Sequence, residues 1–422
     1  MGKDKLKMLE SPWKILGTVA CAGFLASVSF LPAQPKPADS CVACHTDLDE
    51  SLTRQMDGDI HLERGLGCVG CHGGDASQSD QELAMAATRG FAGRPKPAQT
   101  AAFCGKCHSD AGFMKKYNPA LRIDQQAEYL TSVHGKLLGQ GNQMVATCIS
   151  CHGSHGIRSV SHPMSRVYPQ KVAQTCGKCH ADSGYMKSRL PTDQVAHYGK
   201  SVHAEALMKK NDLSAPTCND CHGNHGASPP GVSSVANVCG TCHTRQAEMF
   251  RQSPHNASFQ QLGQAECLVC HDNHEIAPPT DQMLSVEESG TCADCHSEGD
   301  KGYAAAQAMH RSITDLSGRL NEVEQLVTRA ERAGMEVSRA RIGLSEGHDA
   351  LIGARVVVHR FSASHVKTET DRGMASARKT RQLGEQALNE LQFRRKGLAA
   401  SLLVIGLALV AVFFKIRQIE RK

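Results

Sequence analysis

Aromatic side chains are scarce in this sequence, at 4% of 422 residues with a single tryptophan, whereas glycine is abundant at 38 residues. A chain of this length is long enough for two or three domains, but side chains of this composition would struggle to fill an ordinary hydrophobic core. The sequence also has neither a Gly-rich phosphate-binding loop nor a recognisable nucleic-acid-binding module. These absences argue against nucleotide and nucleic-acid binding, and they require something other than side chains to fill the interior.

Cysteine, by contrast, is plentiful and regularly placed. Nine copies of the pattern Cys-x-x-Cys-His use all of the 19 cysteines except Cys21, and we number these copies motif 1 to motif 9 along the chain. Their cysteines are, in order, Cys41 and Cys44, Cys68 and Cys71, Cys104 and Cys107, Cys148 and Cys151, Cys176 and Cys179, Cys218 and Cys221, Cys239 and Cys242, Cys267 and Cys270, and Cys292 and Cys295. Their histidines are His45, His72, His108, His152, His180, His222, His243, His271 and His296.

This pattern is the attachment signature of a c-type haem, in which the cysteines form thioethers with the vinyl groups and the adjacent histidine binds the iron. Zinc sites also use Cys-x-x-Cys pairs, but zinc does not require a histidine directly after every pair. Disulfide frameworks do not require it either. We therefore predict nine covalently attached haem c groups, which would form the core of residues 39–310 and carry much of its folding free energy.

The formal charge of +5 does not indicate a nucleic-acid partner. Each haem brings two propionates, and together these outweigh the positive charge of the polypeptide. The holoprotein is therefore expected to be negatively charged in both oxidation states, and no nucleic-acid partner is predicted.

The remaining histidines follow a repeat that consists of an upstream histidine, a motif with a trailing Gly-x-His element, and a second motif. Four copies fit, although Gly73-Gly74-Asp75 replaces the Gly-x-His element in the first. The candidate distal iron ligands are the upstream His61, His134, His203 and His255, the trailing His155, His225 and His274, and His310. The ninth is either His359 or His365, with His162, His197 and His348 as further options.

A trailing histidine lies too close in sequence to reach the far face of its own haem, so we expect it to bind a neighbouring iron. Bis-histidine ligation at most sites is typical of electron carriers, whereas methionine caps, for which Met56 is one of several candidates, would raise the potential. A catalytic haem needs an open or exchangeable axial position.

The two ends of the chain carry apolar segments. Four lysines precede the apolar run of residues 15–31, so residues 1–38 are predicted to be a signal or anchor segment with a Pro-rich linker. Cys21 resembles a lipoprotein cysteine only weakly. At the other end, the uncharged residues 397–414 are long enough to span a bilayer, and the basic tail to residue 422 favours a cytoplasmic C-terminus.

Between these segments the sequence changes character after Pro279, the last proline. Residues 39–300 are predicted to be a nonahaem cytochrome c domain of short helices and irregular loops around haems. Residues 301–396 are predicted to be an α-helical hairpin or coiled coil, because Ile313, Leu316, Leu320, Val323 and Val327 follow a helical three/four spacing. Glycines at 343, 347 and 353 favour a turn between two antiparallel helices there. Residues 397–422 are the predicted transmembrane helix and tail.

The motifs at Cys148 and Cys218, each followed by Gly-x-His-Gly and preceded by an upstream histidine, resemble those of multihaem cytochromes c with doubled haem motifs. In role, the added membrane anchor is similar to the NapC/NirT quinol-oxidising cytochromes, although this chain carries nine motifs and an additional C-terminal anchor. The resemblance implies periplasmic, low-potential, bis-histidine haems. The similar cytochrome c nitrite reductases have a Cys-x-x-Cys-Lys active haem, and that motif does not occur here.

The sequence thus predicts a nonahaem c-type cytochrome anchored in the bacterial cytoplasmic (inner) membrane, with its haem domain in the periplasm. It would transfer electrons between the quinol pool, directly or through a quinol-oxidising membrane protein, and periplasmic cytochromes, reductases or outer-membrane redox partners. An oxidoreductase acting on small nitrogen or sulfur compounds is the alternative from the enzyme class. A third reading is a scaffold subunit of a respiratory complex.

The motif count is directly measurable. Mass spectrometry of the mature protein from its native host should give the polypeptide mass plus nine haem increments of roughly 616 Da each. A mass that lacks these increments would contradict the prediction of covalent haem.

Overall fold

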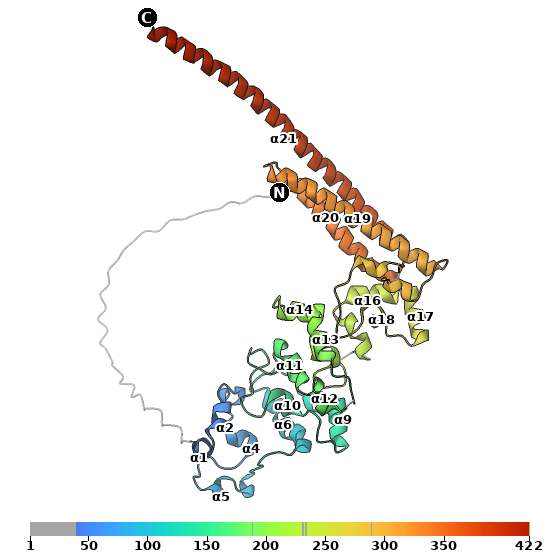
Figure 1. Ribbon diagram of the computed structural model, residues 1–422. Helices are drawn as coiled ribbons and strands as arrows, with labels where there is room; N and C mark the ends of the chain where they lie inside the picture. The colour runs from blue at the N-terminus through green and yellow to red at the C-terminus, as the bar shows by residue number, and fades with distance from the viewer. Residues whose placement is uncertain (1–38, 188, 230–231, 233, 288, 422) are drawn as a thin grey trace, which may run out of the picture.

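The computed structural model describes residues 39–187, 189–229, 232, 234–287 and 289–421. The predicted signal or anchor segment, with Cys21, lies outside these residues. Helices and irregular loops account for the described chain, which has no strand within these ranges. Figure 1 shows two parts, a loop-rich region of short helices and a group of long helices that extends away from it.

Short helices occupy the loop-rich region. The α-helices are α1 (Ser40–Leu48), α2 (Glu50–Gln55), α3 (Ile60–Glu63), α4 (Cys68–His72), α5 (Gln81–Ala84), α6 (Thr100–His108), α7 (Ala111–Met114), α8 (Gln125–Thr131), α9 (Val133–Gly139), α10 (Cys148–His152), α11 (Pro169–His180), α12 (Ser183–Met186), α13 (Gln194–Lys200), α14 (Val202–Met208), α15 (Cys218–His222), α16 (Thr244–Arg251), α17 (Pro254–Leu262) and α18 (Leu268–His271). The 3-10 helices are η1 (Ala87–Arg89), η2 (Pro97–Gln99), η3 (Val235–Thr241), η4 (Asp281–Leu284) and η5 (Thr291–Asp294).

Few side chains are buried in this region. Its one hydrophobic cluster among the described residues consists of Ala101, Tyr129 and Leu138, with Val145 and Cys148 packed against it. A cluster of this size cannot stabilise a region of this length, which agrees with the scarcity of aromatic residues. The region therefore depends on a non-protein interior.

Three long helices make up the second part: α19 (Lys301–Arg332), α20 (Ser338–Val357) and α21 (Ala363–Glu420), with η6 (Val358–Arg360) before the last. We call α19, α20, η6 and α21 up to Lys396 the stalk. The predicted apolar stripe of α19 is confirmed, because its five members are at most 1% exposed. They pack against α20 and α21 in the main hydrophobic core of the described chain.

The prediction of a two-helix hairpin that turns near glycines 343, 347 and 353 is wrong. All three glycines lie inside α20, and the chain instead turns at residues 333–337 and 358–362. Their lack of a side chain permits close packing between helices: a Cβ at Gly343 would lie 2.2 Å from Thr380 Oγ1, and one at Gly347 would lie 2.5 Å from Leu320 Cδ2. These glycines therefore allow the helices to pack closely and do not mark a turn of the chain.

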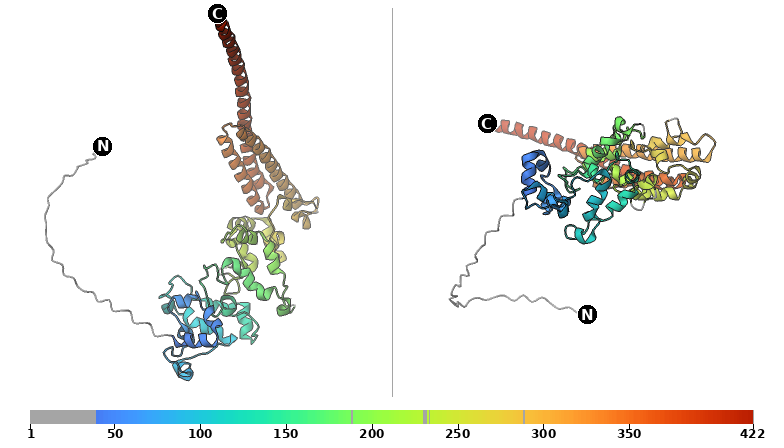
Figure 2. Two further views of the ribbon diagram at one scale, coloured as in Figure 1. Left: turned by 60° about the vertical axis from the view of Figure 1, so that its left-hand side comes forward. Right: turned by 90° about the horizontal axis from the view of Figure 1, so that it is seen from below.

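The stalk is fixed to the short-helix region at its base. Arg355 of α20 forms a bidentate ion pair with Asp281 of η4, with nitrogen–oxygen distances of 2.8 and 2.7 Å. Leu284 of η4 belongs to the stalk core, and Cys292 of motif 9 packs against it. Motif 9 therefore lies against the stalk. In both views of Figure 2 motif 1, on α1, lies at the opposite end of the short-helix region.

Helix α21 continues beyond the stalk through the apolar segment that was predicted to span a membrane. It is the one described helix that is long and apolar enough to do so, with a mean hydropathy of 2.6 over a window of which none is buried. No break separates this segment from the stalk. From Ala363 to Lys396 the helix is about 50 Å long at 1.5 Å per residue.

Close packing at Gly373 of α21 can be tested by substitution. A Cβ there would lie 2.7 Å from Leu316 Cδ2 and 3.1 Å from Ala350 Cβ, so Gly373→Leu should overpack the stalk and lower its stability by about 1–3 kcal/mol. Amide hydrogen exchange should accelerate throughout α19, α20 and the stalk part of α21. The control is Gly318→Leu, because a Cβ on Gly318 meets nothing within 4 Å. Equal protection in both variants would contradict the packing role.

Candidate functional site

The even-numbered motifs 2, 4 and 6 each form a one-turn helix that ends at the motif histidine. The residue that follows has positive φ, which is +89° at Gly153 and +80° at Gly223. Glycine adopts this conformation without steric cost, and it turns the chain sharply away from the motif. In motif 8 Asp272 takes the same role with φ +61°. The turn directs the trailing histidine away from the histidine of its own motif.

The odd-numbered motifs 3 and 5 differ, because they form the last turn of longer helices, α6 and α11. After each, an aspartate caps the next helix: Asp110 accepts from the Phe113 N–H and Asp182 from the Tyr185 N–H, at 2.9 and 3.0 Å. These motifs have no trailing histidine. The two motif types therefore send the chain in different directions.

The four upstream histidines lie in the first turn of short helices, two residues after a buried N-cap. Ser132 and Ser201 accept hydrogen bonds from backbone N–H groups at 3.0 and 3.1 Å, and Asp59 accepts from the His61 N–H at 2.8 Å. Asp59, Ser132, Ser201 and Ser253 are at most 7% exposed. The hydrogen bonds of Asp59, Ser132 and Ser201 fix the start of the helix that carries each histidine.

Eight motif histidines each face a second histidine from another segment. The pairs, with distances between ring centroids, are His61–His108 (6.0 Å), His72–His155 (6.3 Å), His134–His180 (6.1 Å), His152–His225 (6.1 Å), His203–His243 (6.3 Å), His222–His274 (5.9 Å), His255–His296 (5.9 Å) and His271–His359 (6.1 Å). The narrow spread indicates one common geometric requirement.

That requirement fits a single metal ion between two imidazoles. With metal–nitrogen bonds of about 2.0–2.1 Å and a ring nitrogen about 1.2 Å from its centroid, two rings on opposite faces of one metal have centroids roughly 6.4 Å apart. Rings in direct stacking contact would be closer. The eight pairs therefore have the separation that a six-coordinate haem iron needs, with a Cys-x-x-Cys pair beside each.

In several pairs the second ring nitrogen already has a hydrogen-bond partner. Nδ1 of His72 lies 2.9 Å from the Gly93 carbonyl oxygen, and Nδ1 of His359 lies 2.9 Å from that of Val356. Nδ1 of His61 lies 3.1 Å from the Asp59 carboxylate. Such bonds fix the tautomer and orientation of a metal-binding imidazole and leave Nε2 free for the metal.

Two pairing rules follow from the eight pairs. Each upstream histidine faces the odd-numbered motif at the end of its own repeat, as His134 faces His180. Each trailing histidine faces the even-numbered motif of the preceding repeat, as His225 faces His152. The last even motif has no following repeat, and His359 of the stalk faces its histidine instead.

Among the described residues, His45 of motif 1 has no histidine facing it, and the candidates His310 and His365 face no motif histidine. His365 Nδ1 lies 2.8 Å from Ser362 Oγ, and His310 lies on α19. His359 and His365 are six residues apart, and both looked suitable in the sequence. Burial distinguishes them in the structure, because His359 is half-buried and faces His271 whereas His365 is exposed.

Cysteines of successive motifs are also close to one another. The thiols of the first cysteines of neighbouring motifs lie close enough to shift each other's pKa in four pairs: Cys41–Cys68, Cys104–Cys148, Cys176–Cys218 and Cys239–Cys267. Between these pairs, a thiol of each next motif is close enough to raise the pKa of its neighbour electrostatically, at Cys71–Cys107, Cys151–Cys179, Cys221–Cys239 and Cys270–Cys292. The nine motifs therefore form one unbroken series in sequence order.

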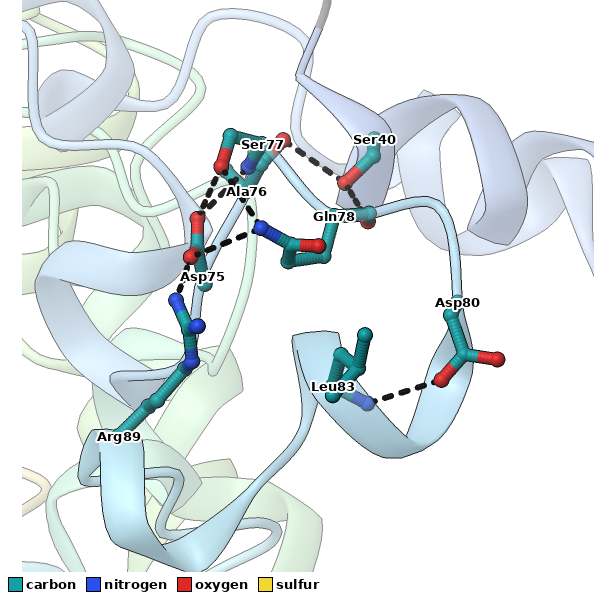
Figure 3. Close-up of polar contacts among 8 residues, drawn as sticks. All are labelled: Ser40, Asp75, Ala76, Ser77, Gln78, Asp80, Leu83 and Arg89. Atoms are coloured by element: carbon teal, nitrogen blue, oxygen red, sulfur yellow. Dashed lines mark hydrogen bonds and ion pairs between the residues drawn. The ribbon is translucent and has the colours of Figure 1, made fainter.

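The segment after motif 2 shows what replaces the missing trailing histidine (Figure 3). Asp75 forms an ion pair with Arg89 and accepts hydrogen bonds from Ser77. The same loop is joined to α1, because Ser40 Oγ donates to the Ala76 carbonyl at 2.7 Å and its N–H donates to that oxygen at 3.0 Å. This loop therefore attaches motif 1 to motif 2 and supplies no axial ligand.

Comparison with known proteins supports the general assignment. Residues 238–318 match the family described as cytochrome c554 and c-prime. The chain is 25% identical over 237 residues to the multihaem cytochrome MtrA of Shewanella baltica, which covers 53% of this chain and 61% of MtrA. It is 23% identical over 216 residues to the C-type polyhaem cytochrome OmcC of Geobacter sulfurreducens, covering 43% of this chain and 26% of OmcC.

The match thus spans less than two thirds of the length of either relative, and no solved structure matches the chain. Together the similarities support a multihaem c-type cytochrome with covalently bound haem c that takes part in electron transfer.

Burial of the paired histidines predicts an acid-sensitive fold. Desolvation lowers the pKa of His134, His152 and His225 below the usual 6.5. Below about pH 6.5 the unfolded chain therefore binds more protons than the folded chain. The free energy of unfolding consequently decreases as the pH is lowered. Ligation to a metal acts in the same direction, because the ligand must be neutral.

The denaturant midpoint of the holoprotein should accordingly be lower at pH 5.5 than at pH 7.5. It should stay nearly constant from pH 7.5 to 8.5, where these histidines are neutral in both states. A midpoint that is equal or higher at pH 5.5 would contradict the burial of neutral imidazoles.

Proposed function

We propose that this protein is a membrane-anchored nonahaem cytochrome c that conducts electrons along its nine haems. The observation that carries the proposal is the set of eight histidine pairs, each with the ring separation that an iron ion between two imidazoles requires. Covalent attachment through the nine motifs would fix each haem in place, and ligation on both faces would keep the iron six-coordinate. An iron of this kind exchanges electrons without binding a substrate, which favours a carrier over the enzymatic alternative.

The proposed haem order follows the order of the motifs in the sequence. Support comes from the proximity of cysteines in successive motifs, because thioethers formed by neighbouring cysteines would bring the edges of successive haems together. Electron tunnelling falls exponentially with distance, so a series of close haems conducts charge over a length that no single haem could cover. The protein sets the spacing, the burial and the potential of each haem.

The stalk bears on the identity of the electron donor. If residues 397–414 span the membrane, about 50 Å of α21 separates the bilayer from the base of the stalk, where motif 9 lies. A quinol inside the bilayer is then too far away to reduce the motif 9 haem directly. We therefore favour a quinol-oxidising membrane protein as the donor, with direct quinol oxidation as the weaker alternative.

The proposed location is the cytoplasmic membrane, with the haem domain in the periplasm. Haem c is attached outside the cytoplasm in bacteria, and Lys415 and Arg417 beyond the apolar segment suit a cytoplasmic tail. Motif 1 would then lie farthest from the membrane. Periplasmic cytochromes, terminal reductases or outer-membrane redox proteins are the proposed acceptors at that end.

Conduction can be tested by removing one internal haem. In the full-length protein a ruthenium photosensitiser on Glu298→Cys, next to motif 9, injects electrons, and a cobalt complex on Glu50→Cys, next to motif 1, collects them. The double substitution Cys148→Ala and Cys151→Ala removes the motif 4 attachment. Transfer to the collector should then slow by orders of magnitude, because the tunnelling distance increases where the series is interrupted.

The matched control keeps the same gap and moves the collector to Asp193→Cys. Asp193 interacts electrostatically with His274, which faces motif 6, so this collector lies on the injector side of the gap. Transfer to it should be unchanged. Undiminished transfer to position 50 in the variant without the motif 4 haem would contradict conduction along a single series.

A further inference from the structure

Motif 1 stands outside the pairing rules that account for the other eight motifs. Motifs 3, 5, 7 and 9 each face the upstream histidine of their own repeat. Motif 1 occupies the same place as these motifs, directly before an upstream histidine that opens the next repeat. It is the last part of a repeat whose upstream histidine would precede Cys41.

The sequence contains no such histidine. Residues 1–40 include 5 lysines and methionines at positions 1 and 8, but no histidine. Among the described residues, the His45 ring faces no other histidine, and His45 itself is exposed. None of the other histidines without a motif partner faces His45 among the described residues: Nδ1 of His162 accepts from the Met164 N–H at 3.1 Å, His197 lies beside Glu275, and the remainder belong to the stalk at the far end.

The first repeat, which contains motif 2, also indicates that the series of motifs ends at motif 1. A trailing histidine after motif 2 would have to face an even-numbered motif of a preceding repeat, and the chain has none. Asp75 and its ion pair with Arg89 occupy that loop instead. At the opposite end of the series the stalk supplies His359 for motif 8. The stalk end is therefore closed by a histidine from the chain, and among the residues that the structure describes the motif 1 end is not.

We infer that the haem iron at His45 has an axial position that accepts small neutral ligands from solution, which makes motif 1 a ligand-binding site at the end of the conducting series. The inference rests on the proposed function, because it assumes haem at motif 1. The class of ligand is a small molecule that donates a lone pair to iron. Neutral ligands are favoured because Asp39, Asp47, Asp49 and Glu50 surround α1 with negative charge, against Arg54 alone on α2.

The test counts open irons in the detergent-solubilised, full-length holoprotein. With dithionite-reduced protein, carbon monoxide titration should show one binding haem per chain among the nine. In the oxidised protein, electron paramagnetic resonance should show one high-spin ferric haem, which free imidazole converts to low spin. His61→Ala removes the partner of His108 and should raise the count from one to two, which shows that the titration detects a single open iron.

Assignment to motif 1 uses Cys41→Ala with Cys44→Ala, which prevents attachment there. This variant should contain eight haems by mass and bind no carbon monoxide. Nine haems in the unaltered protein with no carbon monoxide binding would overturn the inference and leave the proposed function intact. So would carbon monoxide binding that persists in the eight-haem variant, or a methionine–iron charge-transfer band assigned to motif 1. Fewer than nine haems in the unaltered protein would instead contradict the proposed function.

Discussion

The constraint on which this structure depends is the separation of about 6 Å between the two imidazole rings of each pair, which would hold one iron. In each pair the motif histidine and its partner come from different segments, so every haem would connect two stretches of chain. Hydrophobic side chains contribute little to the short-helix region, whose one described cluster has three buried residues. Buried caps such as Ser132 and Ser201, and left-handed turns such as Gly153, are the local means by which the chain brings each pair to about 6 Å.

The stalk is stabilised differently, because its three helices pack against one another through buried apolar side chains. The two parts meet at the base, where Arg355 pairs with Asp281 and the Phe361 ring lies 4.0 Å from the His255 ring, centroid to centroid. His359 belongs to this junction and faces His271 of motif 8. The histidine pair of motif 8 therefore connects the region of short helices to the stalk. A movement of the stalk base would therefore disturb the ligand geometry of motif 8.

Much of the arrangement could be predicted from the sequence, because each Cys-x-x-Cys-His motif and each repeat is a local pattern. The expectation that a trailing histidine reaches another haem agrees with the position of His225, but the sequence does not reveal that it faces the motif of the preceding repeat. The choice between His359 and His365 depends on tertiary burial. The sequence does not predict the third stalk helix, because a glycine that allows two helices to approach, such as Gly347, looks the same in the sequence as a glycine that ends a helix.

The pairing rules also have an evolutionary consequence. Each repeat takes one histidine from itself and gives one to its predecessor, so duplicating or deleting a whole repeat leaves every interior iron with its full ligand set. Loss of only the first half of a repeat, which carries both its upstream and its trailing histidine, would leave two irons without a partner histidine. The length of such a molecule can therefore change in steps of two haems, while His359 of the stalk continues to face the last even-numbered motif.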